Sequence, residues 1–110
     1  MKLVIIESPF APNEKHTVEE HIDYARLCMH DSLLRNEAPY ASHLLYTQES
    51  VLDDTIPEER KLGIEAGFAW KHVAGVLTVF YTDLGYSSGM KQAIEYCRVN
   101  NLPYELRSLH

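Results

Sequence analysis

Two short, almost wholly apolar runs constrain the fold of this chain more than any other feature. One is KLVII at residues 2–6, and the other is VAGVLTVFY at residues 73–81. Runs without polar alternation are typical of strands that are buried on both faces of a parallel sheet. Both are far shorter than the roughly 20 residues that a membrane-spanning helix requires. We therefore expect two buried parallel strands in a soluble protein.

A helical pattern lies between these two runs. Thr17 and Glu20 have the spacing of a capping box, and apolar residues then recur on one helical face. The pattern predicts a helix from about residue 17 to about residue 36, which Asn36 and Pro39 terminate.

Two further helices are predicted in the second half of the chain. Thr55 and Glu58 repeat the capping-box spacing around Pro57, and an apolar stripe follows them. The third predicted helix runs from Ser88 to about residue 100.

Two weaker patterns complete the predicted sheet. Residues 40–45 predict a second short strand, and residues 103–107 predict a last strand, at an edge because it opens with proline. Alternating strands and helices are typical of right-handed crossovers around an open parallel sheet. We expect a three-layer α/β fold of about four parallel strands in the order 2-1-3-4, with helices on both faces.

Composition narrows the class of protein. A chain of 110 residues with 45% hydrophobic and 24% charged residues has the size and balance of one globular domain, residues 1–110. A net charge of -6 with only 10 Lys and Arg argues against a nucleic-acid polymer as partner. Cys28 and Cys97 lack CxxC spacing, so we expect two buried thiols in a reducing compartment. MKLVIIESPF lacks the flank of a cleaved leader, which also favours a cytoplasmic location.

Ligands of open parallel sheets bind outside the carboxyl ends of the strands, near the point where the strand order reverses. This rule selects three segments, which are residues 7–10, 43–46 and 82–89. We expect most of the functional side chains there and mostly scaffold elsewhere.

The segment from Gly85 to Gly89 suits an anion. Small residues let a ligand approach the backbone, and the amino end of the predicted helix offers free N–H groups beside the hydroxyls of Ser87 and Ser88. The pattern is neither a Walker A loop nor GxGxxG. The alternative is a serine N-cap after a turn glycine, which is common on any helix.

Three carboxylates are expected near the crevice, those of Glu7, Glu65 and Asp83. A close pair of carboxylates can act on a glycosidic bond, one as nucleophile on the anomeric carbon and the other as proton donor. The alternative is that Glu65 lies on a solvated helix face and Asp83 caps a turn.

The remaining candidates are the histidines, two helix glycines and two aromatic residues. The six histidines lack ligand spacing, so no metal site and no cofactor is expected. His43 either hydrogen-bonds a ligand or is a satisfied, half-buried histidine. Gly63 and Gly67 give either close helix packing or room for a ligand, and Phe68 and Trp70 either pack in the core or an interface or stack on a base.

The chain resembles the nucleoside 2-deoxyribosyltransferase-like superfamily, and more closely small uncharacterised members from phages and bacteria. The resemblance rests on LVIIESPF, on SHLLYTQESVLDDTIPEERKLGIEAGFAW and on VLTVFYTDLGYSSGMKQAIEYC. It implies a flavodoxin-like or Rossmann-like fold, a homodimer or higher homo-oligomer, and a nucleoside or nucleoside monophosphate as ligand.

The resemblance also implies roles for residues. The loop after the first strand lies by the sugar or base, and the serine-glycine turn receives the 5′-hydroxyl or phosphate. Apart from the resemblance, we expect Tyr46 or His43 to orient the sugar in an enzyme of this kind. The ligand-binding residues implied in the two loops are Glu7, Ser8, Pro9, Phe10, Ser87, Ser88, Gly89 and Met90.

One departure from the family pattern puts its reaction in doubt. The family's nucleophilic glutamate stands four residues after the turn glycine, where this chain has Ala93. The aspartate that often precedes the central strand is also missing. Catalysis would then fall to Glu65 or Asp83.

Three functions follow. The first is binding of a nucleoside phosphate or an ADP-ribose-like ligand in the crevice, with catalysis left open. In its enzyme version the protein cleaves or transfers an N-glycosidic bond of that ligand. The second is a sensor or sponge that binds the same ligand without turnover, and the third is a protein-interaction module on the same fold.

Overall fold

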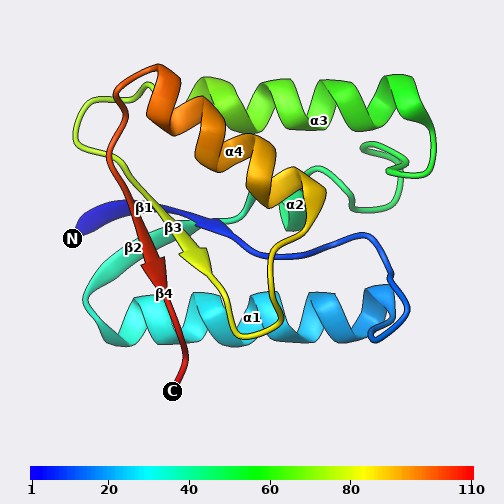
Figure 1. The fold of residues 1–110 in the computed structure, drawn as a ribbon, viewed down its shortest axis with the longest axis horizontal. Coiled ribbons are helices and arrows are strands. Elements are labelled where there is room, and N and C mark those ends of the chain that lie inside the picture. Colours follow the sequence, from blue (N-terminus) through cyan, green and yellow to red (C-terminus); the bar gives the residue numbers. More distant parts are fainter.

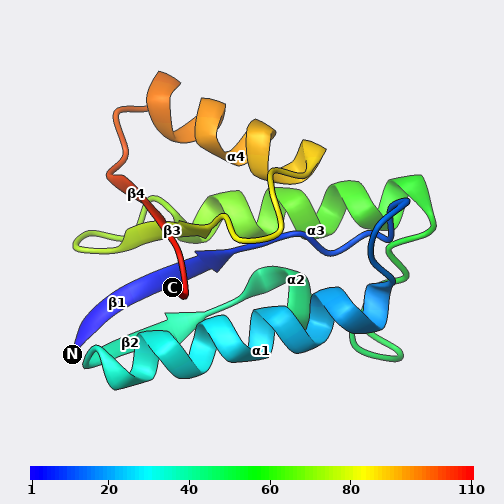
Figure 2. The same cartoon turned by 60° about the horizontal axis from the view of Figure 1, so that its bottom comes forward.

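A computed structural model describes all 110 residues as a parallel sheet between two layers of helices (Figures 1 and 2). The strands are β1 (Lys2–Glu7), β2 (Glu37–Tyr40), β3 (Leu77–Tyr81) and β4 (Tyr104–Arg107). The helices are α1 (Val18–Leu34), α2 (Ser42–Leu45), α3 (Pro57–Trp70) and α4 (Ser88–Val99). All three strand pairs are parallel and the order is β2-β1-β3-β4, which confirms the predicted fold.

Each face of the sheet has its own apolar core. On one face, Val4 and Ile6 of β1 and Val79 of β3 pack with Tyr24 and Cys28 of α1. On the other face, Phe80 packs with Met90, Ala93 and Cys97 of α4. Figure 2 shows α1 on one side of the sheet and α3 and α4 on the other. The all-apolar runs of β1 and β3 are thus explained by burial on both faces.

The predicted strand at residues 40–45 was wrong. The structure ends β2 at Tyr40 and turns Ser42–Leu45 into the short helix α2. The predicted first helix ends at Leu34, just before Asn36, whose φ is 62°, and Pro39 lies beyond it within β2, opposite Val4. Proline is tolerated there because β2 is an edge strand, whose unpaired side needs no N–H donor.

Two other boundaries also differ from the prediction. Ile56 is the N-cap of α3 and makes no side-chain cap, while the hydroxyl of Thr55 donates to Asp53 Oδ1 at 2.6 Å instead of capping the helix. The strand predicted from residue 73 begins only at Leu77, because Gly75 adopts a φ of 83° in the preceding turn. The predicted capping box of Thr17 and Glu20 and the edge position of β4 are confirmed.

None of the helices combines the length and the apolar character that crossing a bilayer requires.

Candidate functional site

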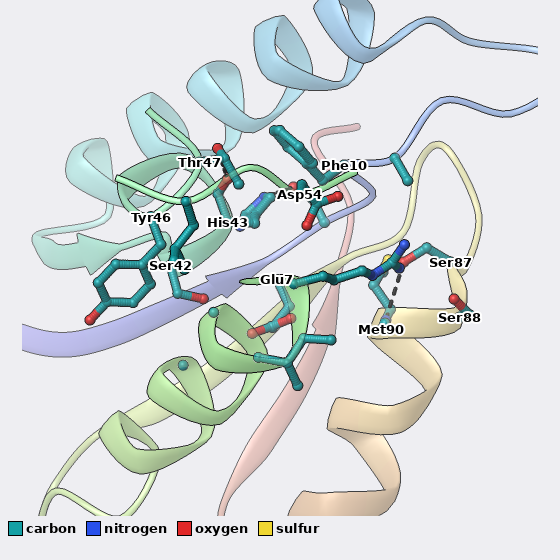
Figure 3. Close-up of a pocket in the computed structure, with 18 of the residues that line it drawn as sticks. Glu7, Phe10, Ser42, His43, Tyr46, Thr47, Asp54, Ser87, Ser88 and Met90 are labelled. Atoms are coloured by element: carbon teal, nitrogen blue, oxygen red, sulfur yellow. Dashed lines mark hydrogen bonds between the residues drawn. The ribbon is translucent and has the colours of Figure 1, made fainter. Parts of the chain in front are cut away.

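A cleft lies at the carboxyl ends of β1 and β3, between α2, α3 and the amino end of α4 (Figure 3). It has about 850 Å³ of empty space when its open mouth is included. The position matches the rule for parallel sheets, because the strand order reverses between β1 and β3.

One face of α3 forms a wall of this cleft. Arg60, Gly63, Ile64, Gly67 and Phe68 all line it. Their spacings of three and four residues place them on the same side of a helix. Gly67 is also a close-packing site, since a Cβ atom there would lie 2.7 Å from Ser42 Oγ of α2. Both readings therefore apply to Gly67, which lines the cleft and permits contact between α3 and α2, whereas Gly63 gives room to the cleft.

Gly67→Ala is expected to lower the free energy of unfolding by about 1 to 2 kcal/mol. The new Cβ would also lie 3.2 Å from Ser42 Cβ, so rotation of the hydroxyl alone does not relieve the clash. The strain exceeds the gain of about 1 kcal/mol that alanine brings to a helix interior. Urea unfolding followed by circular dichroism measures the change.

Gly63→Ala is the matched control. A Cβ at this position meets only the flexible end of Leu52, at 3.3 Å from Cδ1. We expect no loss, or a gain of up to about 1 kcal/mol from helix propensity. If Gly67→Ala stabilised the protein as much as Gly63→Ala, the close approach of α2 and α3 would be wrong.

The amino end of α4 lies at one end of the cleft. Ser87 is its N-cap and accepts a hydrogen bond from Met90 N at 3.1 Å. Ser87, Ser88, Gly89 and Met90 all line the cleft, and the hydroxyl of Ser88 takes part in no hydrogen bond within the protein. The first N–H groups of a helix lack partners within the helix. Met90 N is bonded to Ser87, which leaves the N–H groups of Ser88 and Gly89 and the positive end of the helix dipole at this end of the cleft.

Arg60 is the only lysine or arginine that lines the cleft. The arginine side chains that form ion pairs are those of Arg26, Arg35, Arg98 and Arg107. Arg60 is half-buried, and its guanidinium has neither an ion pair nor a hydrogen bond. Asp54 shares the lining, and burial raises the pKa of its carboxyl above 3.8 while the charge of Arg60 opposes that rise. The cleft therefore has a cation with free donors.

Glu7 lies on the floor of the cleft at the end of β1. Its Oε1 accepts from Lys71 Nζ at 2.8 Å, and the Lys71 side chain is fully buried. The ammonium group also lies 5.5 Å from the centre of the Phe68 ring. Lys71 follows the carboxyl end of α3, where a helix dipole favours a cation.

Ser8 and His43 contact one another across the cleft floor. Ser8 Oγ and His43 Nε2 are 2.8 Å apart, and the Phe10 ring stands edge-on to the imidazole at 6.3 Å between centres. Burial lowers the pKa of His43 below its ordinary value of 6.5, so the ring is neutral at pH 7. All three residues line the cleft, whereas the neighbouring Pro9 is buried behind it.

The far end of the cleft is aromatic. Tyr46 lines it, and its hydroxyl accepts from Trp70 Nε1 at 3.0 Å. Tyr40 lies against both rings, with centres 6.3 Å from Tyr46 and 5.1 Å from Trp70. Figure 3 shows Tyr46 and Ser87 at opposite ends, with Glu7 between them.

The two carboxylates expected to act in catalysis lie outside the cleft. The Glu65 side chain is 59% exposed and faces Lys61 at 3.9 Å. Asp83 accepts from Tyr24 at 2.6 Å and from Ser108 at 2.6 Å, so it joins α1 to the C-terminal segment. Burial opposes ionisation of Asp83, but these hydrogen bonds outweigh it and lower the pKa below 3.8.

Ala93 does not face the cleft either. It is fully buried and packs against Phe80, Met90 and Cys97. The Ala93 side chain is therefore part of the apolar core between α4 and the sheet.

Sequence reasoning missed several residues of the cleft. Arg60 could have been found, because it precedes Gly63 and Gly67 at spacings of three and seven residues on one helical face. Lys71, which holds Glu7 but does not itself line the cleft, gave no local signal, since Glu7 is 64 residues away in the chain. The other lining residues that were missed are Ala11, Ser42, Thr47, Leu52, Asp54, Glu59 and Ile64. The structure has no group of three or more His, Cys, Asp or Glu placed to hold a metal ion.

Comparison with protein families matches residues 2–107 to the family described as Domain of unknown function (DUF7768). No curated protein and no solved structure matches the chain. The family match covers all the strands of the sheet and every residue that lines the cleft. The chain therefore belongs to the DUF7768 family.

Proposed function

We propose that the cleft binds a nucleoside monophosphate, with the phosphate at the amino end of α4 and the base toward Tyr46. The observation that carries this proposal is Arg60, a half-buried cation without a protein partner that lines the same cleft as Ser87 and Ser88. The resemblance to nucleoside 2-deoxyribosyltransferase-like proteins supports the same class of ligand.

The chemistry of the two ends supports this orientation. A guanidinium and the N–H groups at a helix amino end both favour a phosphate, and hydroxyls add donors. The Phe10 and Tyr46 rings offer flat apolar surfaces of the kind on which a base stacks. With a single arginine in the cleft, a monophosphate is matched better than the two phosphates of an ADP-ribose-like ligand.

Binding without turnover is the function that we favour. Glu65 and Asp83 lie outside the cleft, and Ala93 packs in the core. The carboxylates left in the cleft are Glu7, Asp54 and Glu59, of which Glu7 already accepts from Lys71. This arrangement supports a sensor or sponge more than a glycosidase.

A ligand screen tests the proposal. Thermal shift and calorimetry with AMP, GMP, CMP, UMP, the matching nucleosides and inorganic phosphate should show binding of at least one monophosphate. We expect the matching nucleoside to bind at least about tenfold more weakly, because it lacks the charge that Arg60 recognises. Chromatography after prolonged incubation should find no free base.

Two results would contradict parts of this account. Release of free base would establish N-glycosidic cleavage and would rule out a sensor or sponge that binds without turnover. No response to any nucleotide or nucleoside would remove nucleotide binding and leave the protein-interaction module.

A further inference from the structure

We propose that Glu7 recognises the sugar of the bound nucleotide and makes the cleft selective for ribose over 2′-deoxyribose. This inference rests on the proposed nucleotide binding. The resemblance implies a nucleoside or nucleoside monophosphate and does not specify which of the two sugars it carries.

The carboxylate of Glu7 is held in a fixed place. Lys71 Nζ donates to Oε1 at 2.8 Å, and the side chains of Lys71 and Glu7 are 0% and 15% exposed. The Phe68 ring packs against the ammonium group and restricts it further. A long polar side chain loses much rotamer freedom when it binds a ligand, and here the fold has already removed that freedom.

The second oxygen of Glu7 has no partner in the protein. Oε1 accepts from Lys71, whereas Oε2 takes part in no hydrogen bond, and Glu7 lines the cleft. An ionised carboxylate only accepts hydrogen bonds. The floor of the cleft therefore presents an acceptor that a ligand must meet with a hydroxyl or N–H donor, since a desolvated acceptor left unmet weakens binding.

The order of groups along the cleft indicates which part of the ligand meets Glu7. Figure 3 shows Ser87 and Ser88 at one end, Glu7 in the middle, and Tyr46 at the opposite end. A nucleoside monophosphate has the order phosphate, sugar, base. When the phosphate lies by Ser88 and the base by Tyr46, the sugar lies over Glu7.

Ribose and 2′-deoxyribose differ in what they offer a carboxylate. Ribose has two adjacent hydroxyl donors, at the 2′ and 3′ positions, and one oxygen can accept from both. Deoxyribose replaces one donor with a C–H group that cannot satisfy the acceptor. A site built to hydrogen-bond a hydroxyl rejects an analogue that lacks it, because the polar group of the site is then left unpaired.

The experiment compares four pairs of ligands by calorimetry at one salt concentration: AMP with dAMP, GMP with dGMP, CMP with dCMP, and UMP with dUMP. The dissociation constant of the deoxy compound is expected to be at least about tenfold higher in every pair that binds. A ratio near one, or a preference for the deoxy compound, would overturn the inference while leaving nucleotide binding intact. Failure of all eight compounds would instead overturn the proposed function.

Glu7→Gln tests whether Glu7 sets the ratio between the dissociation constants of the deoxy and ribo compounds. The amide keeps the shape of the side chain but loses its charge, so affinity for the ribonucleotide should fall and the ratio should drop below about threefold. Glu65→Gln is the matched control on the exposed face of α3 and should leave the ratio unchanged. An unchanged ratio in a folded Glu7→Gln protein would show that another group reads the sugar. If Glu7→Gln does not fold, the ratios of the unmodified protein still decide the selectivity.

Discussion

Arg107→Met is expected to lower the free energy of unfolding by about 3 to 5 kcal/mol, the largest single effect on stability that the structure predicts. Arg107 of β4 donates to Glu37 of β2 with Nη1 to Oε1 at 2.9 Å and Nη2 to Oε2 at 3.0 Å. The two side chains are only 7% and 11% exposed. Methionine would fill the space but would leave the charge of Glu37 buried with Ser32 as its one remaining partner.

Urea unfolding at pH 7 measures this effect, and Arg98→Met is its control. Arg98 pairs with Glu95 on the surface, where both side chains are more than half exposed, so that replacement should change stability by less than about 1 kcal/mol. Replacing Arg107 and Glu37 together by apolar residues should cost less than Arg107→Met alone, since no charge is left unpaired. A loss below about 1 kcal/mol for Arg107→Met would show that the pair is not buried as described.

The same ion pair makes stability depend on pH with a definite sign. The hydrogen bonds from Arg107 lower the pKa of Glu37 below its ordinary value of 4.5 and outweigh burial, which raises it. A carboxyl whose pKa is lower in the folded state stabilises that state at pH values above the pKa of the unfolded chain. This contribution is lost as the pH falls through the pKa of the folded state. The difference between the unmodified protein and Arg107→Met should therefore be full at pH 7 and smaller at about pH 3.

Arg60→Met is expected to weaken binding of a nucleoside monophosphate by about 10- to 100-fold while the affinity for the free nucleoside is unchanged. The guanidinium has no partner in the protein, so its removal should leave the unfolding free energy within about 0.5 kcal/mol of the starting value. Calorimetry with the best ligand of the screen measures the first quantity and urea unfolding the second.

Lys61→Met is the matched control for Arg60. Lys61 is the next residue of α3, its side chain is 79% exposed, and it does not line the cleft. Its replacement removes one positive charge from the same helix. A loss of affinity for the nucleoside monophosphate that both variants share would therefore come from the electrostatic field of the protein and not from a direct contact. Equal weakening by the two replacements, or none by Arg60→Met, would contradict a phosphate contact by Arg60.

The sheet could be predicted from sequence wherever burial on both faces produces an unbroken apolar run, as in β1 and β3. The edge strand β2 could not, because EAPY is held by backbone pairing with β1 and by Glu37 with Arg107, which lies 70 residues away. The helix α2 has only four residues, too few to show a helical period.

The residues of the cleft also divide into those that follow a local sequence pattern, which could be predicted, and those that depend on contacts distant in the chain, which could not. The turn at Ser87–Gly89 was predicted because an N-cap and a helix start are local patterns. Catalytic roles were expected for Glu65 and Asp83 because both are carboxylates near the predicted crevice. Whether a carboxylate reaches the cleft depends on the direction of its side chain. Glu65 lies on the exposed side of α3, and Asp83 is held by Tyr24 and Ser108.

The most direct test of nucleotide binding in the cleft is a map of backbone amide chemical shifts during titration with the best nucleoside monophosphate. We predict the largest changes at Ser88 and Gly89, at Phe10, and at Tyr46, whose positions span the cleft from the amino end of α4 to α2. Changes confined to the outer face of α1, or no changes at saturating ligand, would contradict a nucleotide site at the carboxyl ends of β1 and β3.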